Sequence, residues 1–176
     1  SDIDSITNTL KGVIKSPKSF DFEIVDGYDI SEYYQTSEYS DGWEESLMGD
    51  SCMNDKGKTD FYSDNDDICE LLILKGTDGK IRGRALLWET NIGKVMDRIY
   101  TISPTDYTLF ILHSNKEGWK RRENFKAGDY SIIDSEGNVI NERVYTEELS
   151  RSPEVTYSSD MPFIDTFPFF IWEDNK

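Results

Sequence analysis

Hydrophobic and polar positions follow three different patterns along the first 67 residues. Ile3, Ile6 and Leu10 stand three or four positions apart, which predicts a helix over residues 1–18. Residues 20–25 then alternate apolar with acidic side chains, as a half-exposed strand does. Residues 28–67 show no strong period and are rich in Ser, Asp, Glu, Gly and Tyr. We expect a long loop there, with room for a short helix near residues 30–34.

The pattern becomes regular from residue 68. Two apolar runs, residues 68–74 and 81–88, flank a turn that contains Asp78-Gly79. Such a pair of runs predicts a β-hairpin. A third strand is expected over residues 94–101, directly after the hairpin.

A helix should follow the third strand. The pattern predicts it over residues 105–117, with Thr105 or Asp106 as its N-cap and Gly118 after its last turn. Another strand is expected over residues 119–125.

The last third of the chain predicts a second hairpin and a packed tail. Residues 130–133 and 139–145 flank a turn rich in Asp, Ser, Gly and Asn, so we expect them to pair. Residues 161–172 are aromatic and apolar, which favours a final strand over a disordered tail.

Together these elements predict one α+β domain over residues 1–176, in which a mostly antiparallel sheet is combined with a few helices. The sheet-forming core is expected in residues 71–176. Residues 1–70 form an acidic part that is rich in helix and loop. No internal repeat or linker divides the chain.

Charge is distributed unevenly between these two parts. The chain has a net charge of −16. Residues 1–70 hold 18 Asp and Glu against 5 Lys and Arg, whereas residues 71–176 hold 17 against 14. Direct binding to nucleic acid requires the opposite sign and is not expected. A protein partner with a basic surface is compatible with this charge.

Residue types for metal, disulfide or cofactor chemistry are scarce. Cys52 and Cys69 are the only cysteines and His113 is the only histidine, so no disulfide framework and no structural zinc site are predicted. Residues 64–67 are acidic but lack the spacing of an EF-hand, and no cofactor motif occurs. We expect neither metal nor cofactor. We expect a cytoplasmic protein for three reasons. The two thiols are expected to be reduced, no apolar window is long enough for a membrane span, and the first residues do not resemble a signal peptide.

Charged side chains inside the predicted central strands are candidates for a site, because burying a charge without a partner is costly. With the aromatic residues beside them, the candidates are Arg84, Trp88, Asp97, Arg98 and Tyr100. A period of two puts Met96, Arg98 and Tyr100 on one face of their strand. Asp97 takes the other face. Three interpretations stay open: structural ion pairs, a solvated face, or a cleft in which Arg84 and Arg98 hold a carboxylate or phosphate.

Cys52 and His113 are further candidates. Cys52 lies between Gly49 and Gly57 in the expected loop, where acidic surroundings would raise the pKa of its thiol and blunt its reactivity. His113 falls in the middle of the predicted helix among apolar residues, and no nucleophile can be paired with it. We expect a helix-surface or core histidine.

The run of elements from residue 71 to 125 resembles the central ββ-β-α-β part of GNAT-type acyltransferases in its topology. In that family, backbone amides of a glycine-containing loop before the helix bind the pyrophosphate of acetyl-CoA. The matching residues 102–106 read Ile-Ser-Pro-Thr-Asp and contain neither glycine nor arginine. Pro104 removes an amide donor, and Asp106 would repel phosphate. The resemblance therefore implies a GNAT-like core with a degenerate acyl-CoA or nucleotide site.

Four short stretches also resemble an uncharacterised family of bacteriophage proteins. They read Ser-Cys-Met at 51–53, Gly-Arg-Ala-Leu-Leu-Trp at 83–88, Met-Asp-Arg-Ile-Tyr-Thr at 96–101 and Pro-Phe-Ile-Asp-Thr-Phe at 162–167. This resemblance implies a viral origin but no activity. It also makes Asp165, in the aromatic tail, and Cys52, in the expected loop, candidate site residues beside those of the central strands.

From these observations we expect a non-catalytic acidic binding module, encoded by a phage, that acts on a host or viral protein. One alternative is an enzyme or nucleotide binder on a GNAT-like core, so catalysis stays open. The other is an acidic mimic of DNA. Duplex DNA as long as a domain of this size, about 40 Å, carries about 24 negative charges. Mimicry therefore requires the carboxylates to gather on one face.

Overall fold

A six-stranded sheet organises the part of the chain that the computed structural model describes, residues 21–55, 59–124, 130–142, 144 and 146. The strands lie in chain order: β1 (Asp21–Val25), β2 (Cys69–Lys75), β3 (Ile81–Thr90), β4 (Gly93–Thr101), β5 (Lys120–Asn124) and β6 (Tyr130–Ile133). Neighbouring strands are antiparallel except β4 and β5. These two run parallel because helix α4 (Pro104–Glu117) connects them across the sheet. The predicted α+β fold with a mostly antiparallel sheet is confirmed.

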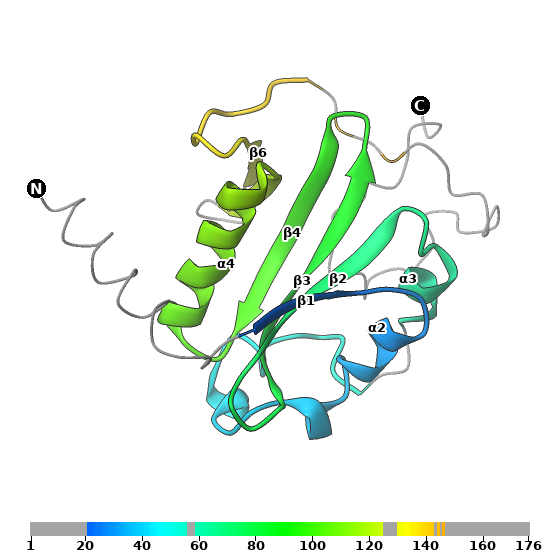
Figure 1. Ribbon diagram of the computed structural model, residues 1–176, viewed down its shortest axis with the longest axis vertical. Coiled ribbons are helices and arrows are strands. Elements are labelled where there is room, and N and C mark those ends of the chain that lie inside the picture. The colour runs from blue at the N-terminus through cyan, green and yellow to red at the C-terminus, as the bar shows by residue number, and fades with distance from the viewer. Residues whose placement is uncertain (1–20, 56–58, 125–129, 143, 145, 147–176) are drawn as a thin grey trace, which may run out of the picture.

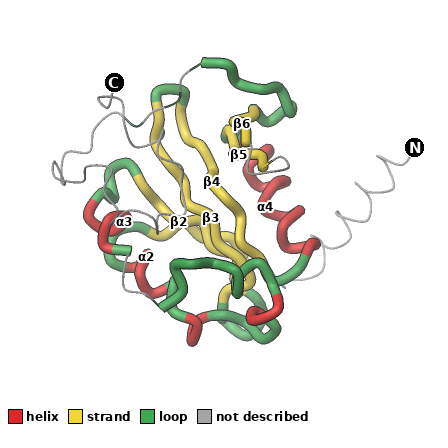
Figure 2. Tube along the Cα trace, turned by 180° about the vertical axis from the view of Figure 1, so that it is seen from behind, coloured by secondary structure: helices red, strands yellow, loops and turns green. Residues whose placement is uncertain are grey.

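Different structures cover the two faces of the sheet. Figure 1 shows α4 on one side of the strands and the short helices α2 (Asp29–Glu32) and α3 (Asp60–Asp64) on the other, and Figure 2 shows the same arrangement from behind. Two 3₁₀ turns, η1 (Thr36–Glu38) and η2 (Trp43–Glu45), lie between α2 and α3 in the chain. The segment of residues 28–67, for which a long loop or a short helix near residues 30–34 was predicted, forms a layer of short helices and turns, and α2 lies close to the predicted short helix.

Each layer has its own hydrophobic core. The α4 side contains Leu72, Leu87, Met96 and Phe110, all at most 1% exposed. On the opposite side, residues of β2 to β4 such as Leu71, Leu86 and Trp88 pack against the layer of short helices and turns over residues 28–67, which we call the irregular layer. This layer contributes Ile30, Tyr34, Tyr39, Met48, Met53 and Tyr62 to the core. Burial on both faces explains why the central strands read as nearly unbroken apolar runs.

Gly83 lets α4 approach the sheet closely. A Cβ atom at this position would come within 2.7 Å of Phe110 Cε2 and 2.8 Å of Thr101 Cγ2. Only glycine fits between the helix and the strand without a shift of one of them.

The ends of α4 confirm one expectation and correct another. Gly118 adopts the left-handed conformation after the last turn, with φ of 75°, as predicted. The N-cap is Ser103 and not Thr105 or Asp106, and Pro104 occupies the first turn. Proline favours that position because its missing N–H would have no helical partner there.

A β-bulge corrects the predicted faces of β4. The register shifts between Ala85 and Leu87 of β3, so that one residue of β3 faces Asp97 and Arg98 together. The extra residue ends strict alternation. Met96 therefore packs on the α4 side, whereas Tyr100 packs on the opposite side.

The second hairpin is shorter than predicted. β6 is present, but the expected strand over residues 139–145 is reduced, in its described residues, to a single bridge between Ile133 and Val139. The carboxylate of Asp134 instead accepts hydrogen bonds from the backbone N–H groups of Glu136 and Asn138, which holds the turn. The predicted helix over 1–18 and strand over 161–172 lie outside the described residues. Within the described residues, no helix is long and apolar enough to cross a membrane.

Candidate functional site

Arg84 is fully buried beneath the irregular layer. Its guanidinium donates hydrogen bonds to the Tyr39 hydroxyl (2.7 Å), to Ser51 Oγ (2.8 Å) and to Asn54 Oδ1 (3.3 Å). With 0% of its surface exposed, it does not face solvent or a cleft. The three acceptors all belong to the layer over the sheet, so Arg84 ties that layer to β3.

Aromatic rings surround the same guanidinium. Arg84 Cζ lies 4.1 Å from the ring centroid of Tyr34, 5.4 Å from that of Tyr39 and 5.3 Å from that of Tyr100. All three distances are within the range of cation–π attraction, which is stronger where water is excluded. Rings and hydrogen bonds together compensate for the burial of this charge.

Trp88 and Asp97 form a second buried polar contact on the same face. Trp88 Nε1 donates to Asp97 Oδ2 at 3.0 Å, and Arg122 Nη1 of β5 donates to Asp97 Oδ1 at 3.2 Å. Asp97 is 1% exposed and Trp88 is 0% exposed. These residues connect β3, β4 and β5, so the geometry fits a structural ion pair.

The other predicted site residues lie apart from this contact. Arg98 is exposed at the bulge and donates from Nη1 to the Tyr100 hydroxyl at 3.1 Å. Cys52 is exposed in the irregular layer. Asp165 lies outside the described residues. The Tyr100 ring lies 5.3 Å from Arg84 Cζ and 5.6 Å from Arg98 Cζ, so it contacts both guanidinium groups.

The first turn of α4 already holds a negative group of the chain itself. Asp106 is 1% exposed, and its carboxylate accepts hydrogen bonds from Ser103 Oγ (2.8 Å) and from Nε and Nη2 of Arg82 (3.2 and 3.0 Å). Ser103 Oγ in turn accepts from the Asp106 N–H. A bound phosphate would face the Asp106 carboxylate at this helix end, so the place that resembles a pyrophosphate loop does not suit an anion.

Three ionisable side chains have shifted pKa values that follow from burial. Desolvation raises the pKa of the Cys69 thiol well above its usual value, and the neighbouring Asp97 and Glu70 charges add to the shift. Desolvation also raises the pKa of Tyr107. The pKa of His113 is lowered, mainly because the imidazole is partly buried where it stacks on Phe22 at 4.3 Å. A shift of this origin indicates packing and does not by itself indicate catalysis.

Negative charge is concentrated in one part of the structure, which we call the acidic segment: residues 21–55 and 59–67. It contains fifteen Asp and Glu and no Lys or Arg; the lysines at 56 and 58 fall in the gap between its two parts. Fourteen of the carboxylate residues are exposed and Glu38 is half-buried. They are Asp21, Glu23, Asp26, Asp29, Glu32, Glu38, Asp41, Glu44, Glu45, Asp50, Asp55, Asp60, Asp64, Asp66 and Asp67.

The rest of the described chain is balanced. It holds ten Asp and Glu against ten Lys and Arg, so all of the net charge of the described residues belongs to the acidic segment. Apart from the edge strand β1, this segment is the layer opposite α4 (Figure 1). The fold therefore separates a strongly negative side from a side of mixed charge.

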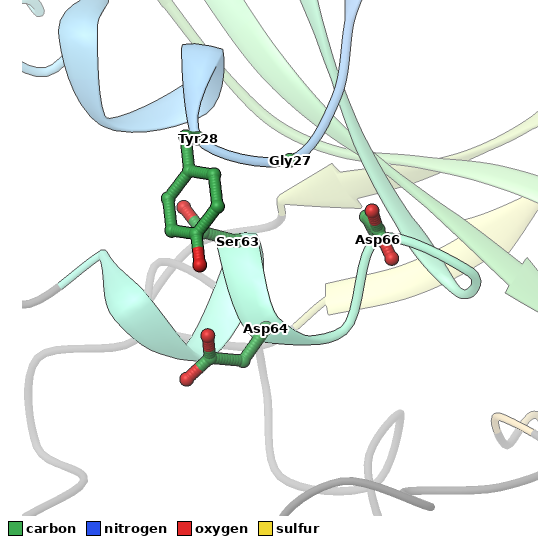
Figure 3. A pocket seen from close by; sticks show the side chains of 5 residues that line it. All are labelled: Gly27, Tyr28, Ser63, Asp64 and Asp66. Atoms are coloured by element: carbon green, nitrogen blue, oxygen red, sulfur yellow. The ribbon is translucent and has the colours of Figure 1, made fainter.

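A pocket of about 310 Å³ opens within the acidic segment, lined by Gly27, Tyr28, Ser63, Asp64 and Asp66. Figure 3 shows the Tyr28 ring extending from the turn before α2 toward the end of α3, where Ser63 and Asp64 lie, with Asp66 in the following loop. Tyr28 is 86% exposed, more than the other exposed large hydrophobic side chains of the described residues. The walls of the pocket thus combine an aromatic ring, a hydroxyl and two carboxylates.

Tyr28 and Arg82 were not predicted as site residues, and residues 64–67 were described only as an acidic stretch without the spacing of an EF-hand. Asp64 and Asp66 were visible as a charge pattern, but their proximity to Tyr28 depends on how the turn before α2 meets the end of α3, which no periodicity encodes. Among the described residues, no group of three or more His, Cys, Asp and Glu is arranged to hold a metal ion. No protein family, curated protein or solved structure matches this chain.

Proposed function

We propose that this protein is a non-catalytic binding module whose acidic segment docks on a basic surface of another protein. The separation of charge carries the proposal. Exposed carboxylates repel one another, and a fold that gathers fourteen of them in the acidic segment, twelve of them outside β1, accepts this cost at the expense of stability. A complementary basic surface on a partner would remove this repulsion and would accelerate the encounter of the two proteins, which explains why the carboxylates are gathered in one segment.

The resemblance to bacteriophage proteins supports a host or viral protein as the partner, met in the cytoplasm of the host cell. The candidate residues of the central strands fit this function as supports. Arg84 holds the layer that presents the carboxylates, and Trp88 with Asp97 connects the strands below it.

Mimicry of DNA is a special case of the same proposal. It applies if the basic surface of the partner is its DNA-binding site. About half of the 24 or so phosphates of a duplex as long as this domain face one side. The fourteen exposed carboxylates of the acidic segment are comparable in number.

A matched pair of triple variants tests the proposal. Glu32, Glu44 and Glu45 of the acidic segment are changed to Gln in one variant, and Glu117, Glu136 and Glu142 of the balanced part in the other. Both remove three exposed charges. Each protein is immobilised and used to capture partners from a lysate of host bacteria at low ionic strength.

We expect basic proteins that bind the wild type and the second variant but are lost from the first. Release of such a protein by duplex DNA would support mimicry, whereas retention would leave a basic surface of another kind. Equal capture by both variants would contradict the proposal, as would capture of acidic proteins alone.

A GNAT-like acyl-CoA or nucleotide-binding enzyme is the second candidate. Two features favour this enzyme. Strands β4 and β5 are parallel and connected through α4, and they pair at only two positions, Val95 with Lys120 and Met96 with Arg121. The buried Asp106 at the start of α4 argues against the cofactor. A ligand at a hundred times its dissociation constant adds about 2.7 kcal/mol of stability, which should raise the thermal midpoint by roughly 5–10 °C. We expect no such shift with acetyl-CoA or nucleotides, and a shift would favour the enzyme.

A further inference from the structure

We infer that the pocket beside Tyr28 receives an arginine side chain of the partner protein. The inference rests on the proposed function, because it names the point at which the acidic segment recognises one residue of a basic surface. The pocket lies where the turn after β1 meets the end of α3, so two separate parts of the chain build it. Its volume of about 310 Å³ is at the lower end for ligand pockets and suits a side chain.

The walls of the pocket match the chemistry of a guanidinium group. The exposed Tyr28 ring offers a face for stacking, and Asp64 and Asp66 offer carboxylate oxygens to planar N–H donors (Figure 3). Arginine combines both interactions, because its planar group stacks on aromatic faces and donates to two oxygens at once. A metal ion would use the carboxylates but would leave the ring without a role.

Ser63 adds a neutral polar side chain to the pocket lining. The residue is 7% exposed and lines the pocket. Its hydroxyl is 3.3 Å from that of Ser31, and Ser31 Oγ also accepts a hydrogen bond from Thr59 at 2.7 Å. A hydroxyl has one donor and two acceptor positions, and the Ser31 contact uses one of the three. Ser63 therefore retains an acceptor for an N–H group that enters the pocket.

The same layer already binds a guanidinium in this manner. Arg84 lies 4.1 Å from the Tyr34 ring centroid, and its donors reach hydroxyl and amide oxygens of Tyr39, Ser51 and Asn54. The pocket offers a ring and oxygen acceptors too, but at the surface and with two carboxylates. We therefore expect arginine to bind in preference to lysine, whose compact ammonium stacks less well.

The experiment compares fluorescent octa-arginine and octa-lysine peptides as probes for the full chain at low ionic strength. The wild type should bind octa-arginine about tenfold more tightly, a ratio within the range of one well-placed cation–π contact. Tyr28→Ala should abolish this preference while changing the affinity for octa-lysine less than about twofold. Tyr28→Phe keeps the ring and should retain the preference.

Two double variants separate the pocket from the general charge. Asp64→Asn with Asp66→Asn should weaken octa-arginine binding at least tenfold. Asp41→Asn with Asp50→Asn removes the same charge from exposed positions elsewhere in the acidic segment and should cost about threefold or less. Asp41 lies next to Ser40, whose N–H bonds to Ile81 O at the start of β3. The pocket lies at the other end of the sheet strands, where β1 ends. From the rise per residue of a β-strand, we place Asp41 about 20 Å from the pocket.

The outcomes distinguish the two proposals. Equal losses in both double variants, or an unchanged arginine preference in Tyr28→Ala, would overturn the pocket while leaving the acidic segment as the docking surface. No binding of either peptide would overturn the docking surface and the pocket together. Thermal melting of each variant confirms that it is folded, which the 86% exposure of Tyr28 favours.

Discussion

Arg84 of β3 donates a hydrogen bond of 2.7 Å to the hydroxyl of Tyr39, and this contact joins the centre of the sheet to the acidic segment. The same residue reaches Ser51 and Asn54. Little regular structure holds the acidic segment together, since its helices are at most five residues long. Its shape therefore depends on contacts of this kind with the sheet below.

Arg84→Lys should lower the free energy of unfolding by about 2–4 kcal/mol, because an ammonium cannot reproduce the forked contacts and each hydrogen bond to a charged group contributes about 1.5–3 kcal/mol. Urea denaturation measures the change. Arg98→Lys, at an exposed position, is the matched control and should cost less than about 0.5 kcal/mol. Equal effects of the two substitutions would show that Arg84 does not anchor the layer.

Trp88→Phe should lower the free energy of unfolding by about 1–3 kcal/mol beyond the effect of the change in packing. The reason is that Asp97 Oδ2 would lose the indole donor at 3.0 Å while the carboxylate stays buried. Trp43→Phe is the comparison, because Trp43 is half-buried and keeps its edge contact with Tyr39. Both losses are measured by chemical denaturation. If Trp88→Phe is no more destabilising than Trp43→Phe, the contact with Asp97 adds nothing to stability.

His113 should make stability depend on pH below neutrality. Partial burial lowers its pKa below the usual 6.5, so the unfolded chain binds the proton more readily than the folded one. The stabilising contribution of the neutral imidazole is complete above pH 6.5 and is lost as the pH falls through the lower pKa of the folded state. His113→Phe keeps a ring on Phe22 and removes the titration.

The measurement for His113 is the difference in unfolding free energy between the wild type and His113→Phe, followed from neutral to mildly acidic pH. The difference cancels the contribution of the many carboxylates. The wild type should lose stability relative to the variant as the pH falls. A constant difference would mean that the His113 pKa is the same in both states.

The two cysteines should differ in reactivity. Cys52 is exposed, whereas Cys69 is buried on β2 and burial raises the pKa of its thiol. A disulfide reagent at mildly alkaline pH should therefore modify one thiol per native chain quickly and the second only after denaturation, because the thiolate is the reactive form. Rapid reaction of both thiols in the folded protein, or of neither, would contradict the placement of these residues.

The sequence allowed most of the sheet to be predicted. Apolar runs marked β2, β3 and β4, the Asp-Gly turn marked their hairpin, and Gly118 marked the end of α4. These are local signals that survive in the fold because neighbouring strands in the chain are also neighbours in the sheet.

Other features depend on contacts that are distant in the chain. The bulge at Asp97 and Arg98 places Met96 and Tyr100 on opposite faces of the sheet, and a pattern of period two cannot reveal an extra residue. Structural ion pairs, a solvated face and a ligand cleft were all open for Arg84, whose guanidinium instead hydrogen-bonds to Tyr39 and Asn54, which lie 45 and 30 positions earlier in the chain. Charge composition did indicate the acidic segment, whereas the pocket beside Tyr28 needed the structure.

The most direct test of the central claim is to map the amide NMR shifts of the isotopically labelled chain during titration with octa-arginine peptide, which stands in for a basic partner surface. We expect the perturbed amides to belong to the acidic segment, with the largest changes at residues 27–28 and 63–66, and we expect added salt to reverse these changes. Perturbations centred on α4 and β5, or no perturbation at low ionic strength, would contradict this claim.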